Sequence, residues 1–274
     1  IEDVKEPVAG PGEVLVRVVA TSMNPTETAL RSGRLAGIVP VELPLTLGWD
    51  VAGIVAGAPV IGMLDLGAAA EVAVAPAGRV VRAPEAVSLV DAAALPLAGM
   101  TAWQAVGEHA QVGAGERVLI NGAGGGIGGF AVQVAKHRGT YVIATASPRS
   151  AVAVAALGAD EVLDYTAGPL RLEPVDAVVN CAAIDAAAAA ALPGLVRDGG
   201  RVVTVATPVE PAGEVRAWHM VVRNDPADLA ELVRLVDLGV IRLDISGRRD
   251  LADLPELHRL SERGELRGKV VVTL

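Results

Sequence analysis

One segment restricts the possible folds of this chain more than any other, the glycine-rich stretch VLINGAGGGIGGFAVQVAK at residues 118–136. An apolar run, Arg117–Asn121, leads into the glycines, a helix-like run follows them, and a second apolar run, Tyr141–Ala146, comes next. Glycines between a strand and a helix let the backbone approach a pyrophosphate, which the free N–H groups and the positive dipole end of the helix attract. The pattern predicts a dinucleotide-binding turn. The alternative is a tight turn that only packs a helix against a strand.

The residues of this turn that we expect to bind the cofactor are those around the start of the helix: Gly122, Gly125, Gly126, Ile127 and Gly128. The phosphate-binding pattern GxxxxGK[ST] is missing, which disfavours nucleoside triphosphate hydrolysis.

The end of the second strand indicates which dinucleotide fits. An acidic residue there would bind the adenosine ribose, and a basic one would accept a 2′-phosphate. The sequence is YVIATASPRS, with Ser147 and Arg149 and neither Asp nor Glu, which favours NADPH. The alternative for Arg149 is a surface residue at the start of a helix.

The remaining sequence predicts two kinds of domain. Before residue 82, short apolar runs alternate with Gly, Pro and Asp, which is typical of strands. After Thr101, strand-like and helix-like runs alternate, which predicts βαβ units and a parallel sheet. We expect an α/β fold with a β-rich domain over residues 1–97, a Rossmann domain over 98–226 and a return to the first domain over 227–274. The later elements that we expect are a helix at 185–196, a strand at 220–222, a helix at 228–238 and a final strand in GKVVVTL.

Composition and charge exclude several classes of protein. One cysteine, Cys181, allows no intrachain disulfide, and the four histidines lack ligand spacing, so we expect no metal site. A net charge of −9 without a basic run argues against nucleic acid. The longest apolar stretch is interrupted by Asp185 and Pro193, which argues against a membrane span. With no signal-peptide pattern at its start, we expect a cytoplasmic protein.

An ordered set of motifs gives the chain a family resemblance. In sequence order they are GPGEVLVRVVATSMNPTE, LPLTLGWDVAGIV, GAAAEVAVAP, LPLAGMTAWQAV, the glycine-rich turn, LGADEVLDY and GKVVVTL. Together they resemble the zinc-independent quinone oxidoreductases of the medium-chain dehydrogenase/reductases. The resemblance implies a GroES-like catalytic domain divided by a Rossmann domain, with NADPH as cofactor and a quinone or an α,β-unsaturated carbonyl as substrate.

Residue-by-residue matching to that family implies further site residues. Asn24 would hold the nicotinamide ribose or a carbonyl oxygen, and Thr101 would lie near the nicotinamide amide; both are our catalytic candidates and also cofactor-binding candidates. Tyr165 is expected at the adenosine end, and Cys181 is included among the cofactor-binding residues. Each residue also has a purely structural alternative. Asn24 would form an Asn-Pro turn, and Thr101 would cap a helix with its hydroxyl. Tyr165 would be a half-buried core residue, and Cys181 a small core residue.

The chain departs from related patterns at informative positions. Zinc-bearing relatives carry Gly-His-Glu where this chain has Gly48-Trp49-Asp50, and a Cys near Ser22, so we expect hydride transfer without a Lewis acid. Some quinone reductases have a tyrosine where this chain has residues 28–30, so we expect the proton to come from solvent or substrate. Short-chain dehydrogenases share the glycine spacing but need Tyr-x-x-x-Lys, which neither tyrosine provides.

Several points remain open at this level. The substrate is expected to be small, apolar and electron-poor, with an enoyl reductase and an NADPH-binding protein without turnover as alternatives. Relatives commonly dimerise through Rossmann sheet edges, so we expect a homodimer. Against the family pattern the chain begins on what resembles the second strand and is shortened near residues 55–59, 169–174 and 211–215. Either the sequence is part of a longer polypeptide or these loops are short.

Overall fold

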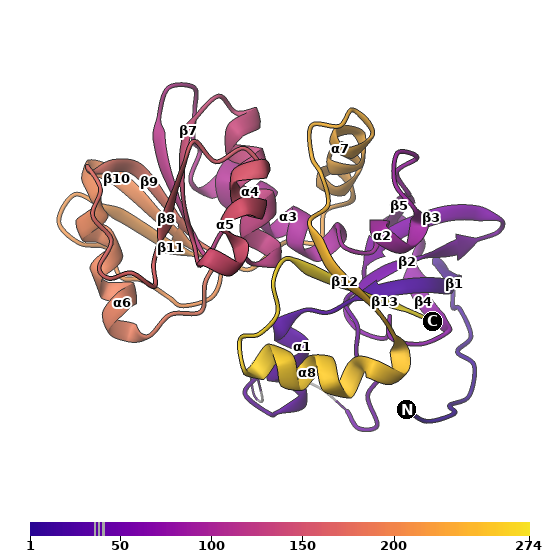
Figure 1. Cartoon of the computed structure of the whole chain (residues 1–274). Helices are drawn as coiled ribbons and strands as arrows, with labels where there is room; N and C mark the ends of the chain where they lie inside the picture. Colours follow the sequence, from indigo (N-terminus) through magenta and orange to yellow (C-terminus); the bar gives the residue numbers. More distant parts are fainter. Residues whose placement is uncertain (36, 38, 40–41) are drawn as a thin grey trace. The chain divides into compact units, whose positions relative to one another are not determined.

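The structure is a computed structural model that describes residues 1–35, 37, 39 and 42–274. The chain forms two compact units, and each is described by itself (Figure 1). Unit 1 consists of Ile1–Leu97, Asn224–Gly239 and Ile245–Leu274, and unit 2 of Ala98–Arg223 and Val240–Asp244.

The units divide after residues 97 and 223, where the sequence predicts divisions after 97 and 226. A short piece near the C-terminal end, residues 240–244, also packs with unit 2. The reason is a pair of hydrogen bonds to Gln133: the Arg242 N–H donates to its Oε1 (2.7 Å), and its Nε2 donates to the Arg242 carbonyl (3.0 Å).

Unit 2 is built on a six-stranded parallel sheet with the order β11-β10-β9-β6-β7-β8. Its strands are β6 (Arg117–Asn121), β7 (Tyr141–Ala146), β8 (Glu161–Asp164), β9 (Val175–Asn180), β10 (Val196–Thr204) and β11 (Arg216–His219). The chain runs from β6 through β7 to one edge, then resumes at β9 on the other side of β6. The strand order therefore reverses at the carboxyl ends of β6 and β9, where open α/β sheets bind ligands.

The helices of unit 2 follow the strands in sequence. Helix α4 (Gly126–His137) packs on β6 and β7, and α5 (Pro148–Ala156) packs on β7 and β8. Helix α3 (Pro96–Gln104) precedes the sheet and continues into a π-helical turn, Ala105–His109. The predicted alternation of strands and helices around a parallel sheet is confirmed.

Two predicted elements of unit 2 have different bounds in the structure. The helix predicted at 185–196 is α-helical only as α6 (Ala186–Ala191); a 3₁₀ turn containing Pro193 follows, and Val196 already begins β10. The strand predicted at 220–222 is wrong, because β11 ends at His219, which pairs with Thr204 at the end of β10. Val221 is largely exposed.

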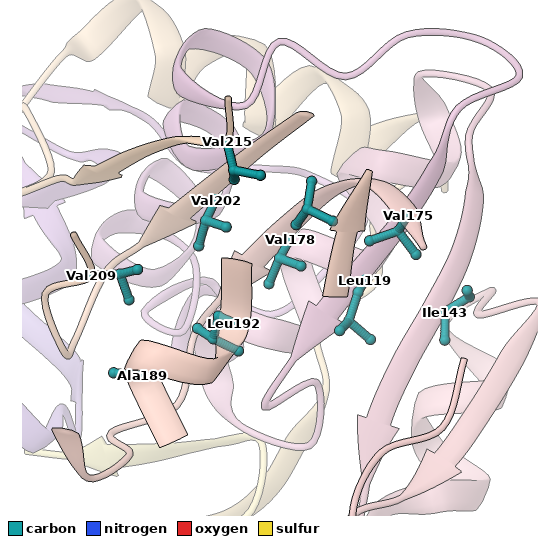
Figure 2. Packing of buried hydrophobic residues seen from close by; sticks show 10 residues of the cluster. Leu119, Ile143, Val175, Val178, Ala189, Leu192, Val202, Val209 and Val215 are labelled. Atoms are coloured by element: carbon teal, nitrogen blue, oxygen red, sulfur yellow. The ribbon is translucent and has the colours of Figure 1, made fainter. Parts of the chain in front are cut away.

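The core of unit 2 is made of small aliphatic side chains. Because both faces of a parallel sheet are covered, its central strands are continuous apolar runs. Leu119, Val178 and Val202 are fully buried within one cluster, in which α6 and its following turn contribute Ala189 and Leu192 (Figure 2). Burying each such aliphatic side chain contributes about 1.5–3 kcal/mol, so this core holds the strand ends in place.

Unit 1 is built on a seven-stranded sheet, in the order β12-β13-β1-β2-β3-β5 with β4 also paired to β1. Its strands are β1 (Glu13–Ser22), β2 (Asp50–Val55), β3 (Ala58–Met63), β4 (Val72–Pro76), β5 (Val80–Arg82), β12 (Ile245–Asp250) and β13 (Lys269–Thr273). Its helices are α1 (Pro25–Arg31), α2 (Leu89–Ala92), α7 (Pro226–Asp237) and α8 (Leu254–Glu262). The pairing of β13 with β1 is antiparallel and joins the last strand to the first.

Sequence patterns did not indicate β12 or α8. Strand β12 reads ISGRRD and contains no apolar run, so only its parallel pairing with β13 reveals it. Helix α8 buries Leu254, Leu257 and His258 on one face, and its packing against α1 supplies the partner that a short helix requires.

Candidate active site

Two glycines in the turn after β6 are required by close packing. Gly122 has a φ of +83°, and a Cβ added there would lie 2.8 Å from the Cβ of Ala182. A Cβ on Gly128 would lie 2.2 Å from the Gly122 carbonyl oxygen. These positions need glycine whether or not a ligand binds, because any side chain would collide with its neighbours.

The start of helix α4 leaves backbone donors open. Gly125 is the N-cap residue and supplies no side-chain cap, and the first turn contains no acidic residue. The N–H groups of Gly126, Ile127 and Gly128 occupy the first helical positions, which have no partner within a helix. A Cβ on Gly125 would meet only the Gly122 carbonyl oxygen, at 3.5 Å. The turn therefore presents N–H groups and an uncrowded backbone to an anion such as a pyrophosphate.

Three polar side chains brace the strand ends beside this turn. Asn121 Nδ2 donates to Asn180 Oδ1 (2.8 Å), and Thr145 Oγ1 donates to Asn121 Oδ1 (2.7 Å). The Gly122 N–H in turn donates to Thr145 Oγ1 (2.8 Å). Sequence reasoning missed these residues; the available signal was a polar residue at or near the end of an otherwise apolar strand.

The candidates for the adenosine end follow β7 and β8, so they lie at the same edge of the sheet as the glycine turn. Ser147 is the N-cap of α5 without a side-chain cap bond, and Arg149 is exposed in the first turn of that helix. Tyr165 follows β8 and is 53% exposed, which argues against the core alternative.

Cys181 directly follows β9, and its N–H donates to the Asn121 carbonyl (2.8 Å). Burial raises the pKa of its thiol to about 12, so the thiolate is scarce at neutral pH. This supports a packing role beside the turn and gives no indication of a nucleophile.

Thr101 lies inside helix α3 and is buried, so it is not an N-terminal cap. The π-helical turn that follows α3 is tied down by Gln104, whose Nε2 donates to the Arg223 carbonyl and whose Oε1 accepts from the Arg223 N–H, both at 2.9 Å. Such π-turns are frequent at functional sites because they re-aim a helix face.

Asn24 lies in unit 1, within a buried polar cluster. Its Nδ2 is 2.9 Å from Asp50 Oδ2 and 3.3 Å from Glu27 Oε1, and its Oδ1 accepts from Lys269 Nζ (2.7 Å). Asp50 also accepts from the Leu97 N–H (2.7 Å) and from Ser22 Oγ. Asn24 therefore does more than form an Asn-Pro turn, because its side chain is hydrogen-bonded within this cluster. Sequence reasoning did not identify Glu27 and Lys269 as its partners.

Two family models match the chain. Residues 10–59 match the alcohol dehydrogenase GroES-like domain, and residues 157–272 match a zinc-binding dehydrogenase domain. The first match lies within unit 1, and the second covers part of unit 2 together with the C-terminal segments of unit 1. The chain belongs to the quinone oxidoreductase-like family of the medium-chain dehydrogenase/reductases.

Individual relatives agree with this assignment. The chloroplast envelope quinone oxidoreductase homolog of Arabidopsis thaliana is 38% identical over 66% of this chain, which spans 64% of that relative. The trans-enoyl reductase pgmF of Aspergillus terreus is 28% identical, and the match covers 97% of this chain and 87% of the length of pgmF. The structure of the quinone oxidoreductase of Thermus thermophilus, solved also with NADPH, is 29% identical in sequence and matches with a TM-score of 0.84. The match covers 100% of this chain and 95% of the Thermus chain.

Residues 48–50 of this chain, which stand where zinc-bearing relatives carry Gly-His-Glu, have a structural role. Gly48 has a φ of +101°, and a Cβ there would lie 2.4 Å from the Ala69 nitrogen, so the backbone requires glycine. Trp49 and Asp50 follow it.

Within residues 1–35, 37, 39 and 42–274, no three His, Cys, Asp or Glu side chains lie close enough together to hold a metal ion. In the same residues, no helix combines the length and apolar character that crossing a membrane requires.

Proposed function

We propose that this chain is an NADPH-dependent oxidoreductase that transfers a hydride to a quinone or an α,β-unsaturated carbonyl without zinc. The observation that carries the proposal is the glycine turn where the strand order reverses, with backbone donors open at the start of α4. The chain spans less than two thirds of the Arabidopsis thaliana quinone oxidoreductase homolog, so the name of that protein supports the proposal by analogy only.

The residues at the sheet edge fit a dinucleotide phosphate. A Cβ at Gly125 would have room in the protein alone, so glycine there is explained by something that approaches the backbone from outside. The N–H groups of Gly126, Ile127 and Gly128 would hold the pyrophosphate. Ser147 and Arg149 would hold the 2′-phosphate, Tyr165 would contact the adenosine, and Cys181 would pack beside the turn.

The chain's own contribution to the reaction is binding and orientation. When bound, the reduced nicotinamide supplies the hydride. Asn24 and Thr101 would orient the nicotinamide end, and apolar side chains would exclude water from the acceptor. Residues 28–30 offer no phenol, so we propose that the reduced acceptor takes its proton from solvent.

One experiment tests the reaction directly. Oxidation of NADPH should be followed by absorbance with a panel of quinones, short enones and aromatic aldehydes. Turnover of a quinone or enone supports the reductase, whereas tight NADPH binding without oxidation across the panel supports a binding protein without turnover. A preference for short enoyl thioesters would favour the second candidate function, enoyl reduction, which the pgmF relative suggests through its match over 97% of this chain.

The choice of NADPH over NADH is tested at Arg149. Arg149→Ala should raise the KM for NADPH much more than it changes kcat, because the contact is made equally in the ground state and the transition state. Arg197→Ala is a matched control, since that arginine pairs with Asp176 near the amino ends of the strands. A wild-type preference for NADH would overturn the assignment of Arg149.

The remaining proposals concern assembly and location. Strand β11 is an edge of the unit 2 sheet, and we propose that two copies pair there to form a homodimer. Sedimentation of the wild type and of Ala217→Pro, which removes a backbone donor from β11, tests this. We propose a cytoplasmic location, although the plant relative carries a chloroplast name; fractionation of the source cells decides it.

A further inference from the structure

Five polar side chains form a buried cluster in unit 1. They come from the end of β1, the N-cap and first turn of α1, the start of β2 and the start of β13. Each is at most 4% exposed: Ser22, Asn24, Glu27, Asp50 and Lys269. Burying polar groups is costly unless they are hydrogen-bonded, so the geometry of this cluster is tightly constrained.

The chemistry of its neighbours fixes the orientation of the Asn24 amide. Lys269 can only donate, so the atom 2.7 Å from its Nζ must be the amide oxygen. The Asp50 carboxylate can only accept, so the atom 2.9 Å from its Oδ2 must be the amide nitrogen. The Ser22 carbonyl (3.1 Å) and Glu27 Oε1 (3.3 Å) also face that nitrogen.

The Asn24 side-chain amide consequently has little capacity left for further hydrogen bonds. Its two N–H hydrogens are shared among three acceptors, while its oxygen accepts, among the residues that the structure describes, from Lys269 alone. One lone pair on Oδ1 is the position at which Asn24 can still form a hydrogen bond. Asn24 can accept from a ligand but cannot donate to a carbonyl oxygen.

The cluster contains two carboxyl groups and one ammonium. Burial raises the pKa of Glu27 to about 8; the charge of Asp50 adds to the rise, and the Asn24 hydrogen bond and Lys269 oppose it. Where α1 packs against α8, Arg31 pairs with Glu262, and both charges act on the pKa of His258. Glu27 is therefore neutral at pH 7, and its ionisation would place a second negative charge beside Asp50.

We propose that Glu27 and Lys269 are positioning residues, which together with Asp50 hold Asn24 so that it only accepts a hydrogen bond, from a hydroxyl or amide donor of the reduced dinucleotide. The inference rests on the proposed function for the identity of the ligand. Oxidised quinones and enones present only acceptors, so Asn24 serves the cofactor and leaves the carbonyl of the substrate untouched.

The first test needs no ligand. The side-chain amide resonances of Asn24, assigned with Asn24→Ser, should shift with a midpoint near pH 8 in the wild type. Glu27→Gln keeps an acceptor for Nδ2 and cannot ionise, so the shift should vanish. Glu262→Gln, a control carboxyl on α8, should leave it unchanged. An unaltered shift in Glu27→Gln would refute the positioning role.

The second test measures the dissociation constant of NADPH. Between about pH 7 and about pH 9, wild-type affinity should fall at least about fivefold, while Glu27→Gln stays constant. Glu27→Ala should bind weakly at every pH, and recovery in Glu27→Gln separates positioning from mere folding. Equal pH profiles in wild type and Glu27→Gln would overturn the proposal. If the wild type binds no NADPH, the proposed function fails, and the amide titration still decides whether Glu27 holds Asn24.

Discussion

Two glycines of the same turn differ in what a methyl group would meet. A Cβ on Gly128 would overlap the Gly122 carbonyl oxygen at 2.2 Å, whereas a Cβ on Gly125, where φ is −89°, would have ordinary contact at 3.5 Å. The sequence presents both as members of one glycine run. Only the coordinates separate the glycine that packing requires from the one that a ligand would require.

Alanine substitutions should therefore separate the two roles. Gly128→Ala should destabilise the protein by about 1–3 kcal/mol, because a crowded backbone must shift. Gly125→Ala should change stability by less than about 0.5 kcal/mol. It should weaken NADPH binding, because a methyl group would stand where we propose that the pyrophosphate approaches the backbone. Thermal unfolding and NADPH titration of both variants provide the measurement. Equal losses of stability would contradict the distinction.

Glu27 should make stability depend on pH. Its pKa is raised from 4.5 to about 8, so the folded state binds a proton more tightly than the unfolded state does. The associated stabilisation is complete below pH 4.5 and is lost as pH rises to 8, which amounts to a few kcal/mol. Glu27→Gln should flatten the decline in unfolding free energy across this window, as measured by denaturant titration at successive pH values. An unchanged slope would argue against a buried neutral carboxyl.

At the scale of elements, one arginine on β10 holds the segment that connects the π-helical turn to β6. Arg201 Nε donates to the Ala110 carbonyl, and its Nη2 donates to the Gln111 carbonyl (3.3 Å) and to Glu116 (2.6 Å). Its side chain is only 10% exposed. One guanidinium thus pairs with the buried Ala110 carbonyl and with two partly exposed acceptors, at Gln111 and Glu116.

Removing this arginine should loosen that segment. Arg201→Gln is expected to cost about 1–3 kcal/mol, because it leaves the buried Ala110 carbonyl unpaired and removes the ion pair with Glu116. Arg197→Gln, at the exposed ion pair with Asp176, should cost less than about 1 kcal/mol. Urea unfolding gives both values, and hydrogen exchange at residues 110–116 should rise only in the first variant. Similar values would show that burial of Arg201 contributes little.

Helices and strands whose own residues carry a recognisable pattern, such as an apolar run or a capping residue, were predictable from the sequence. Strands β6, β7 and β9 are mostly apolar runs, and α7 begins at Pro226 after its N-cap Asp225, whose side chain accepts from the Ala227 N–H (2.9 Å). Elements that depend on a partner were not. Strand β12 exists because β13 lies beside it, and the polyalanine run at 185–196 divides into a helix, a turn and a strand because β10 pairs with β9 at Val196.

At the scale of the whole molecule, ligand binding should stabilise the chain by mass action. NADPH at about 100 times its dissociation constant should add about 2.7 kcal/mol to the unfolding free energy. NADH at the same concentration should raise the melting temperature less, and Arg149→Ala should remove the difference between the two. Differential scanning fluorimetry makes the comparison. Equal shifts from both cofactors in the wild type would contradict a 2′-phosphate contact.

The sequence by itself determined the local geometry of the glycine-rich turn, because a strand, glycines and a helix follow one another within residues 117–137. It could not indicate the surroundings of Asn24. Lys269 is 245 positions away, and its only signal is a charge at the start of an apolar strand. Antiparallel pairing of β13 with β1 brings that charge to Asn24 and Asp50. Contacts between distant positions are set by sheet pairing, which no local pattern records, so the tertiary structure alone decided which hydrogen bonds Asn24 makes within the protein.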